Sequence, residues 1–474
     1  MAQAKKKSTV SKAQDETKKP GAWLKYGKKE LQELEALCSG YEDFLSECKT
    51  ERESVTEAVR QAEKAGYRDL AKIVSQKKKL KPGDKVYAVN MHKALVLFNL
   101  GSDPLEQGLT ILGAHIDSCR LDVKQNPLYE DSGMAFLDTH YYGGIKKYQW
   151  VTLPLALHGV IAKKDGTTVT VRLGEDPGDP VFCVTDLLIH LSQEQLKKSA
   201  ATVIEGENLD ILVGNQPLKG KDKDAVKAGV LKLLYDKYGV SEDDFLSAEL
   251  CLVPAGRARD LGFDRSMILA YGHDDRVCAY TSLQAMLKTG KMQRTACCLL
   301  VDKEEIGSVG ATGMRSRFFE NTLCELLNCL GQYSELGTRR CLENSVMLSS
   351  DVSSAYDPLY AQAFDKKNVA YLGRGMVFNK FTGARGKSGS NDANAEYVAK
   401  LRAILDKKGV SYQFAELGKV DLGGGGTIAY IMSLYGMEVI DSGVAVLSMH
   451  APWEAVSKAD VYETCKGYLA FLGL

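Results

Sequence analysis

The chain has 474 residues, of which 45% are hydrophobic and 26% charged, and its 61 basic and 61 acidic residues give a net charge of zero at pH 7. This length can bury a large core and suggests two to four domains. The balanced charge shows no basic footprint for nucleic acid. No apolar run approaches the roughly 20 residues that span a bilayer. We therefore expect a globular protein with neither a nucleic-acid nor a membrane partner.

Residues 1–20 are rich in Lys, Ser and Gln and contain no apolar core of a secretion signal. We predict a disordered tail there and a cytoplasmic location. None of the 12 cysteines forms a C-x-x-C pair, and Cys297 and Cys298 are adjacent inside an apolar run. Reduced core cysteines are therefore expected, rather than disulfides or a zinc finger.

The first periodic segment, residues 28–64, has apolar positions at helical spacing and predicts helices with a break at Ser39-Gly40. Alternation through residues 86–100 predicts a hairpin around Asn90. Four short apolar runs, with helical patterns between several of them, predict buried strands at 109–114, 296–301, 345–348 and 444–447. Buried strands with intervening helices indicate an α/β fold in which helices flank a mixed sheet.

Residues 124–255 differ from the rest, because they contain an alternating segment at 167–173 and few clusters of acids or histidines. We predict that they form a second, strand-rich domain inserted into the first. The main domain would then comprise residues 21–123 and 256–474.

Acidic and histidine side chains follow each of the four predicted strands, and they are His115, Glu304 with Glu305, Asp351, and His450. Sites in open α/β sheets form beyond the carboxyl ends of strands, so these side chains are expected to converge. A further acidic pair, Asp274-Asp275, precedes an expected helix at 277–287. Any one of these features alone is more often a solvated turn, but their combination favours a site.

Metal binding is the chemistry that this set of side chains favours. Three carboxylates (Asp274, Glu305, Asp351) and two neutral imidazoles (His115, His450) carry a charge of −3, which two divalent cations and one hydroxide neutralise. Mixed histidine and carboxylate ligands suit Zn²⁺, with Mn²⁺ or Co²⁺ as substitutes. A shared carboxylate holding two metals about 3.5–4 Å apart is the arrangement of hydrolytic two-metal sites.

Two neighbouring acids have complementary roles in such a site. Glu304, adjacent to a metal-binding Glu305, can act as the general base for water. Asp117 lies two residues beyond His115, on the same side of an extended segment, and can accept the ring N–H of that histidine.

Five segments resemble the aspartyl-aminopeptidase family of metallopeptidases, which includes vacuolar aminopeptidase I of yeast. They are GAHIDSCRLD (113–122), GHDDR (272–276), DKEEIGSVGATG (302–313), SSDVSSAYDP (349–358) and VLSMHAPWE (446–454). The resemblance covers the chain from about residue 85, and the related tetrahedral aminopeptidases share the same site. Within the family, the chain looks like a bacterial-type member.

The resemblance implies a zinc aminopeptidase that removes single N-terminal residues from peptides with a free N-terminus. It implies two metals per chain with Asp274 as the bridging ligand, Glu304 as the catalytic base and Asp117 as the partner of the first histidine. It also implies a cis peptide between Asp274 and Asp275. The metal ligands that it implies are His115, Asp274, Glu305, Asp351 and His450.

The resemblance further implies that the inserted region, 124–255, is a dimerisation domain and that the chain assembles as a hollow homo-dodecamer built from dimers. In the family this domain lends a histidine to the neighbouring protomer's site, and the segment LLIHL (187–191) indicates His190.

The alternatives left open are a two-metal carboxypeptidase or deacylase of the same clan and an inactive scaffold or cargo protein. The segment 380–397 departs from the eukaryotic pattern, so Lys380 and Arg385 either receive an acidic first residue of the substrate or are solvated loop charges.

Overall fold

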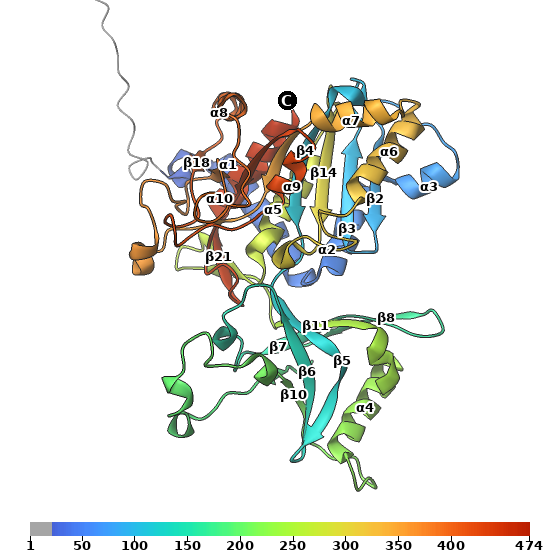
Figure 1. Ribbon diagram of the computed structural model, residues 1–474, viewed down its shortest axis with the longest axis vertical. Coiled ribbons are helices and arrows are strands. Elements are labelled where there is room, and N and C mark those ends of the chain that lie inside the picture. The colour runs from blue at the N-terminus through green and yellow to red at the C-terminus, as the bar shows by residue number, and fades with distance from the viewer. Residues whose placement is uncertain (1–20) are drawn as a thin grey trace, which may run out of the picture.

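Residues 21–474 are described by the structure, a computed structural model, and the tail predicted at residues 1–20 lies outside the described residues. A nine-stranded mixed sheet forms the centre of the upper lobe in Figure 1 and has the strand order β1-β2-β3-β14-β4-β15-β19-β17-β18. Its strands are β1 Arg68–Asp69, β2 Lys85–Asn90, β3 Ala94–Asn99, β4 Leu109–His115, β14 Thr295–Val301, β15 Val346–Ser350, β17 Met376–Asn379, β18 Tyr412–Phe414 and β19 Glu438–Gly443.

Three of the four predicted buried strands are central strands of this sheet. β4 pairs in parallel with both β14 and β15, and every residue of the three strands is buried. β2 and β3 form the predicted hairpin. They are antiparallel, with Lys85 opposite Asn99 at one end and Asn90 opposite Ala94 at the other. The expectation of a mixed α/β fold is confirmed.

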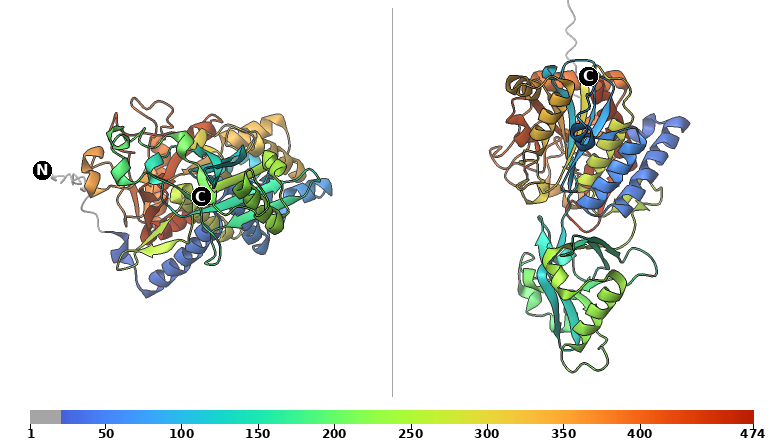
Figure 2. Two further views of the ribbon diagram at one scale, coloured as in Figure 1. Left: turned by 90° about the horizontal axis from the view of Figure 1, so that it is seen from below. Right: turned by 90° about the vertical axis from the view of Figure 1, so that its right-hand side faces the viewer.

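Helices cover both faces of the sheet, and each face has its own apolar core. Figure 2 shows the sheet edge-on between the two helical layers. One layer contains α1 Lys28–Glu47, α2 Glu51–Lys64, α5 His273–Leu287, α8 Ala395–Lys408 and α10 Lys458–Leu472. The other contains α3 Leu70–Ser75, α6 Phe318–Leu330, α7 Glu335–Glu343 and α9 Ala429–Ser433. No helix within residues 21–474 combines the length and apolar character needed to cross a membrane.

The predicted helix break at Ser39-Gly40 is wrong, because α1 continues through both residues and ends at Glu47. Gly40 serves close packing instead, since a Cβ there would lie 2.6 Å from the hydroxyl oxygen of Tyr280. The break falls at Thr50, whose side chain caps α2 by accepting the N–H of Glu53.

A seven-stranded sheet with its own apolar core forms the lower lobe in Figure 1. Its strand order is β8-β7-β11-β5-β6-β10-β9. Its elements are β5 Arg120–Asp131, β6 Met134–Tyr142, β7 Leu155–Ala162, β8 Thr168–Leu173, β9 Cys183–Val184, β10 Ile211–Gly214, α4 Ala225–Tyr238 and β11 Ala248–Pro254. The sequence boundary expected at residue 124 lies inside β5.

The fourth predicted strand belongs to a separate five-stranded sheet of order β12-β13-β21-β20-β16. Its strands are β12 Arg259–Leu261, β13 Met267–Ala270, β16 Ser353–Ser354, β20 Ala445–Leu447 and β21 Glu454–Ser457. The chain leaves β19 at Gly443, where a Cβ would lie 2.0 Å from the carbonyl oxygen of Asp351. Glycine is therefore required at the point where the chain crosses from the large sheet to the small one.

A buried network of charges joins the two lobes. His158 on β7 places Nδ1 2.8 Å from Glu53 Oε1 and Nε2 3.0 Å from Glu175 Oε1. Lys49 Nζ lies 2.7 Å from Glu175 Oε1 and donates to the carbonyl of Pro254 at 2.6 Å. Burial opposes a charged imidazole, but the two carboxylates raise the pKa of His158 above its usual value. The imidazolium therefore bridges the α2 layer and the lower lobe.

We expect His158→Gln to lower the free energy of unfolding by about 2–4 kcal/mol at pH 6, because it removes the cation shared by Glu53 and Glu175 and leaves Lys49 to pair with Glu175 alone. A raised folded-state pKa gives stability that is complete below the unfolded pKa of about 6.5 and lost as the pH rises through the folded pKa. In urea denaturation, the difference between wild type and variant should thus be larger at pH 6 than at pH 9. The exposed His140→Gln serves as the control, and a pH-independent difference for His158→Gln would contradict a charged imidazole.

Candidate metal centre

The predicted metal-binding side chains lie together at one edge of the central sheet. Since β4, β14 and β15 run parallel, their carboxyl ends meet there, and α5 and the segment after β20 bring the remaining two side chains to the same place. The side chains are His115 at the end of β4, Glu304 and Glu305 in the short helix η9 Glu304–Ile306 after β14, Asp351 after β15, Asp274 in the first turn of α5, and His450 after β20.

The Asp274 carboxylate lies between two imidazole rings. His115 Nε2 is 3.2 Å from Asp274 Oδ1, and His450 Nε2 is 3.2 Å from Asp274 Oδ2. The peptide between Asp274 and Asp275 is cis, as expected. Two groups of possible ligands, with donor atoms within 4.8 Å of one another in each, are His115, Asp274 and Asp351, and Cys119, Glu305 and His450. Asp274 therefore directs Oδ1 to the histidine of the first group and Oδ2 to the histidine of the second.

The tautomers of both histidines suit metal binding. His115 Nδ1 lies 3.0 Å from the carbonyl oxygen of Asp117, and His450 Nδ1 lies 3.0 Å from the carbonyl oxygen of Gly144. A carbonyl oxygen can only accept, so each Nδ1 carries the proton. In a neutral ring this leaves the Nε2 lone pair directed at Asp274, where a cation between nitrogen and carboxylate satisfies both.

The carboxylates of this site are buried, and the side chains around them carry too little positive charge to offset theirs. Burial raises the pKa of Glu304 to about 7 and that of Glu305 to about 8, and it raises the pKa of Asp351 well above its usual value. Asp274 differs: although burial opposes its charge, the imidazoles of His115 and His450 on either side hold its pKa below the usual value. Divalent cations would supply the missing charge, so the donor set fits zinc.

Asp117 organises more of the site than the sequence indicated. Its Oδ1 lies 3.3 Å from His115 Nδ1, as expected of a partner of that ring. It also accepts the backbone N–H groups of Glu304 and Glu305, each at 3.2 Å, and the hydroxyl of Tyr142 at 2.8 Å. One buried carboxylate thus orients a histidine and the acidic turn together.

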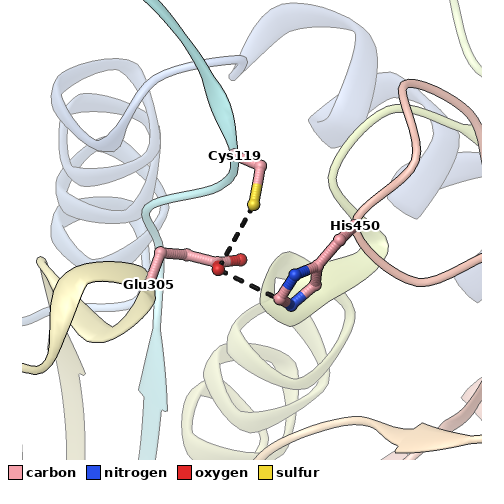
Figure 3. Close-up of side chains that lie close together, drawn as sticks. All are labelled: Cys119, Glu305 and His450. Carbon is pink, nitrogen blue, oxygen red and sulfur yellow. Dashed lines mark hydrogen bonds and ion pairs between the residues drawn. The ribbon is translucent and has the colours of Figure 1, made fainter. Parts of the chain in front are cut away.

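Cys119, expected from the sequence only as a reduced core cysteine, also adjoins the site. Figure 3 shows Cys119, Glu305 and His450 converging from three separate segments, with Cys119 Sγ 3.3 Å and His450 Nε2 3.6 Å from Glu305 Oε2. A Cβ on Gly143 would lie 2.6 Å from Cys119 Sγ, so only glycine permits this approach of the chain. The one signal in the sequence is that Cys119 follows His115 by four residues.

The sequence analysis missed Glu454, although it ends the motif that contains His450. It is buried, and it accepts the backbone N–H of Asp274 at 3.0 Å and that of His450 at 2.7 Å. It thereby ties the start of α5 to the segment after β20. No spacing rule would have identified this role, because it depends on two backbone groups that are 176 residues apart.

A cavity of about 440 Å³ opens beside these side chains. It is lined by Gly144, Asp274, Glu304, Glu305, Gly307, Asp351, Val352, Asn379, Thr382, Leu417, Gly424, Gly425, Gly426, Thr427, Asp441, Met449 and His450. Among these described residues there is no lysine or arginine. Lys380 lines a different cavity, together with Phe381 and Arg402.

His190 is not brought to the site within the chain. It is exposed in the short helix η5 Ile189–Leu191, which belongs to the lower lobe, and it does not line the site cavity.

The fold and the donor set define a metallopeptidase, and comparisons with known proteins specify the kind. Residues 44–472 match the family described as aminopeptidase I zinc metalloprotease (M18), so the chain belongs to this family of zinc aminopeptidases. A Clostridium acetobutylicum protein described as "Probable M18 family aminopeptidase 1" is 62% identical, over 95% of this chain and 97% of its own length.

Solved structures agree with this assignment. The M18 aminopeptidase of Thermotoga maritima superposes with a TM-score of 0.91 at 44% identity, covering 96% of this chain and 99% of that one. Aminopeptidase I of Clostridium acetobutylicum gives a TM-score of 0.89 at 60% identity, covering 96% and 99%. A structure of the yeast mApe1 dodecamer, at 19% identity and a TM-score of 0.73, covers 91% of this chain and 95% of its own and shares the fold.

Removal of zinc is expected to lower the melting temperature of the protein, because the buried carboxylates lose the cations that offset their charge. A metal present at a thousand times its dissociation constant contributes about 4 kcal/mol to stability. Differential scanning fluorimetry before and after chelation, with zinc counted by mass spectrometry, measures this effect. Zinc should restore the melting temperature and magnesium, which prefers oxygen ligands, should not. An unchanged melting temperature after complete zinc loss would argue against the centre.

Proposed function

We propose that this zinc aminopeptidase holds two zinc ions per chain and removes the N-terminal residue of peptides with Glu304 as general base. The observation that carries the proposal is the Asp274 carboxylate, which directs one oxygen to His115 and the other to His450, each at 3.2 Å. A carboxylate that serves two donor groups is what a two-metal hydrolytic site requires.

The ligands divide between the two ions as follows. His115 and Asp351 would hold one ion and Glu305 and His450 the other, with Asp274 shared between them. Bound zinc would polarise the scissile carbonyl and lower the pKa of a water molecule.

Glu304 moves the proton in this proposal. Its Oε2 lies 3.9 Å from His115 Nε2, and burial raises its pKa to about 7. A carboxylate with a pKa near neutrality can both accept a proton from water and release it to the leaving amine nitrogen. Asp117 keeps Glu304 in place by accepting its backbone N–H.

The other hypotheses have less support. A two-metal carboxypeptidase or deacylase would share the donor set, but the family match covers residues 44–472 and is to aminopeptidases. An inactive scaffold or cargo protein predicts loss of a ligand or of the base, and all six positions retain suitable side chains. They are His115, Asp274, Glu304, Glu305, Asp351 and His450.

We expect Glu304→Gln to lower kcat for leucyl-p-nitroanilide by about 10²–10⁴-fold, because the amide cannot accept the water proton. Leucine is chosen as the first residue because no lysine or arginine lines the described cavity. The zinc content should stay that of wild type, which mass spectrometry checks. Asp274→Asn is the contrasting variant, since it should lose zinc as well as activity. A Glu304→Gln enzyme with wild-type kcat would refute the role of Glu304.

Assembly is the second part of the proposal: the lower lobe, comprising most of residues 124–255, dimerises, and dimers build a homo-dodecamer. Exposed apolar side chains on this lobe support it, among them Leu187, Leu188, Ile189 and Leu191 around His190. A largely apolar cavity of about 1060 Å³ also opens on the lobe between α4 and the seven-stranded sheet. Apolar surface of this extent is typical of protein interfaces. His190 would then reach the cavity of a neighbouring protomer.

His190→Ala is expected to leave the zinc content unchanged and to lower kcat/KM for leucyl-p-nitroanilide. Mixing it with an excess of the zinc-retaining Glu304→Gln variant, under conditions of subunit exchange, should restore activity, because the inactive protomer supplies His190 to its neighbour. The mass of each assembly is checked by light scattering, and His92→Ala, at another exposed histidine, is the control. A monomeric wild type, or no rescue in mixed assemblies, would contradict the shared site.

A cytoplasmic location completes the proposal. All 12 cysteines are free, although several lie in the same cores, which is the pattern of proteins in a reducing compartment.

A further inference from the structure

Asp441 is a buried acid in the site cavity with no role in the proposed metal centre. It lies on β19, is 2% exposed and lines the cavity together with Asp274 and Glu304. Its Oδ1 accepts the hydroxyl of Thr427 at 2.6 Å, and the hydroxyl of Ser349 on the paired strand β15 also lies beside the carboxylate, whereas its Oδ2 has no hydrogen-bond partner within 3.5 Å. A buried carboxylate oxygen without a donor is costly unless a ligand supplies one.

The charges around the cavity identify the kind of ligand. Five acids line it, and they are Asp274, Glu304, Glu305, Asp351 and Asp441. Three of them are proposed zinc ligands and Glu304 is the proposed base, so Asp441 alone has no assigned positive partner. His450 is the only basic side chain among the described lining residues. The one positive charge that every aminopeptidase substrate brings is its α-ammonium group.

We propose that Asp441 binds the α-ammonium group of the substrate's first residue through Oδ2. This inference rests on the proposed function, because it takes the cavity beside the candidate metal centre as the substrate site. A charge-assisted hydrogen bond to a buried carboxylate gives strong preference for a charged amine over an uncharged group. Asp441 would thus make the enzyme select peptides with a free N-terminus.

The surroundings of Asp441 hold its carboxylate in position. Thr427 follows three glycines that line the cavity, Gly424, Gly425 and Gly426, and its hydroxyl both donates to Asp441 and accepts the N–H of Ala429 at 3.2 Å. This arrangement restrains Oδ1 and leaves Oδ2 for a ligand. Burial raises the pKa of Asp441 to about 7, so an incoming ammonium group would favour the charged carboxylate.

A matched pair of inhibitors tests the proposal in the zinc-loaded enzyme. Leucine hydroxamate and 4-methylpentanohydroxamate bear the same metal-chelating group and side chain, but only the first has an α-amino group. The quantity measured is the ratio of their inhibition constants, des-amino over amino, in wild type and in Asp441→Asn. This ratio cancels general losses of folding or zinc, which affect both inhibitors equally.

We expect the ratio to fall by about 10- to 100-fold in Asp441→Asn, because the charged hydrogen bond is lost. The inhibition constant of the des-amino compound and the zinc content should stay near wild type, and KM for leucyl-p-nitroanilide should rise more than kcat falls. An unchanged ratio in a folded, zinc-loaded variant would overturn the role of Asp441.

Asp460→Asn is the matched control. Asp460 is also buried, and burial likewise raises its pKa to about 7, but it accepts the N–H groups of Gly373 and Gly375 and does not line the cavity. Its substitution should lower the melting temperature and leave the inhibitor ratio unchanged.

Thr427→Val decides the question if Asp441→Asn does not fold. It keeps the carboxylate but removes the donor to Oδ1, so the ratio should fall by a few-fold, and an unchanged ratio would contradict the proposal.

The wild-type enzyme separates this inference from the proposed function. Failure to bind zinc or to cleave any free-N-terminal anilide would refute the proposed function, whereas activity with an unchanged ratio in the variants refutes only the role of Asp441.

Discussion

The structure depends on one carboxylate, that of Asp274, which lies between His115 and His450 at 3.2 Å from each Nε2. Buried acids gather around it at the edge of the central sheet, where β4, β14 and β15 end. So much negative charge out of water is unfavourable unless cations enter. The same constraint makes the edge a candidate metal centre and accounts for the raised pKa values of Glu304, Glu305 and Asp351.

The lower lobe completes this centre as well as presenting an apolar surface. At the end of β6, the hydroxyl of Tyr142 donates to Asp117, and the carbonyl of Gly144 accepts Nδ1–H of His450. Both contacts set the orientation of side chains around Asp274. Because β5 and β6 belong to the lower sheet, the geometry of the metal centre depends on how the lobes are joined. The buried His158 network is one such connection.

In the proposed site, the acids of the cavity serve two kinds of cation, the zinc ions and the ammonium group of the substrate. Zinc would neutralise the carboxylates that face Asp274, while Asp441, on the neighbouring β19, is left to pair with a positive group on the substrate. The two kinds of cation differ in lifetime, because the metal stays and the ammonium group leaves with each product. A site rich in buried acids can therefore combine metal binding with recognition of a free N-terminus.

The amino-acid sequence by itself determined four short buried strands, the hairpin at residues 86–100 and the polar residues at the ends of those four strands, because short apolar runs and the polar residues after them are local patterns. That was sufficient to name His115, Asp274, Glu304, Glu305, Asp351 and His450 as one set. Only the tertiary structure decided that α1 passes through Gly40, that β20 lies outside the main sheet, and that Cys119, Asp441 and Glu454 adjoin the site. The roles of Cys119, Asp441 and Glu454 come from contacts between segments far apart in sequence, such as Glu454 with the N–H of Asp274, and no local pattern encodes such contacts.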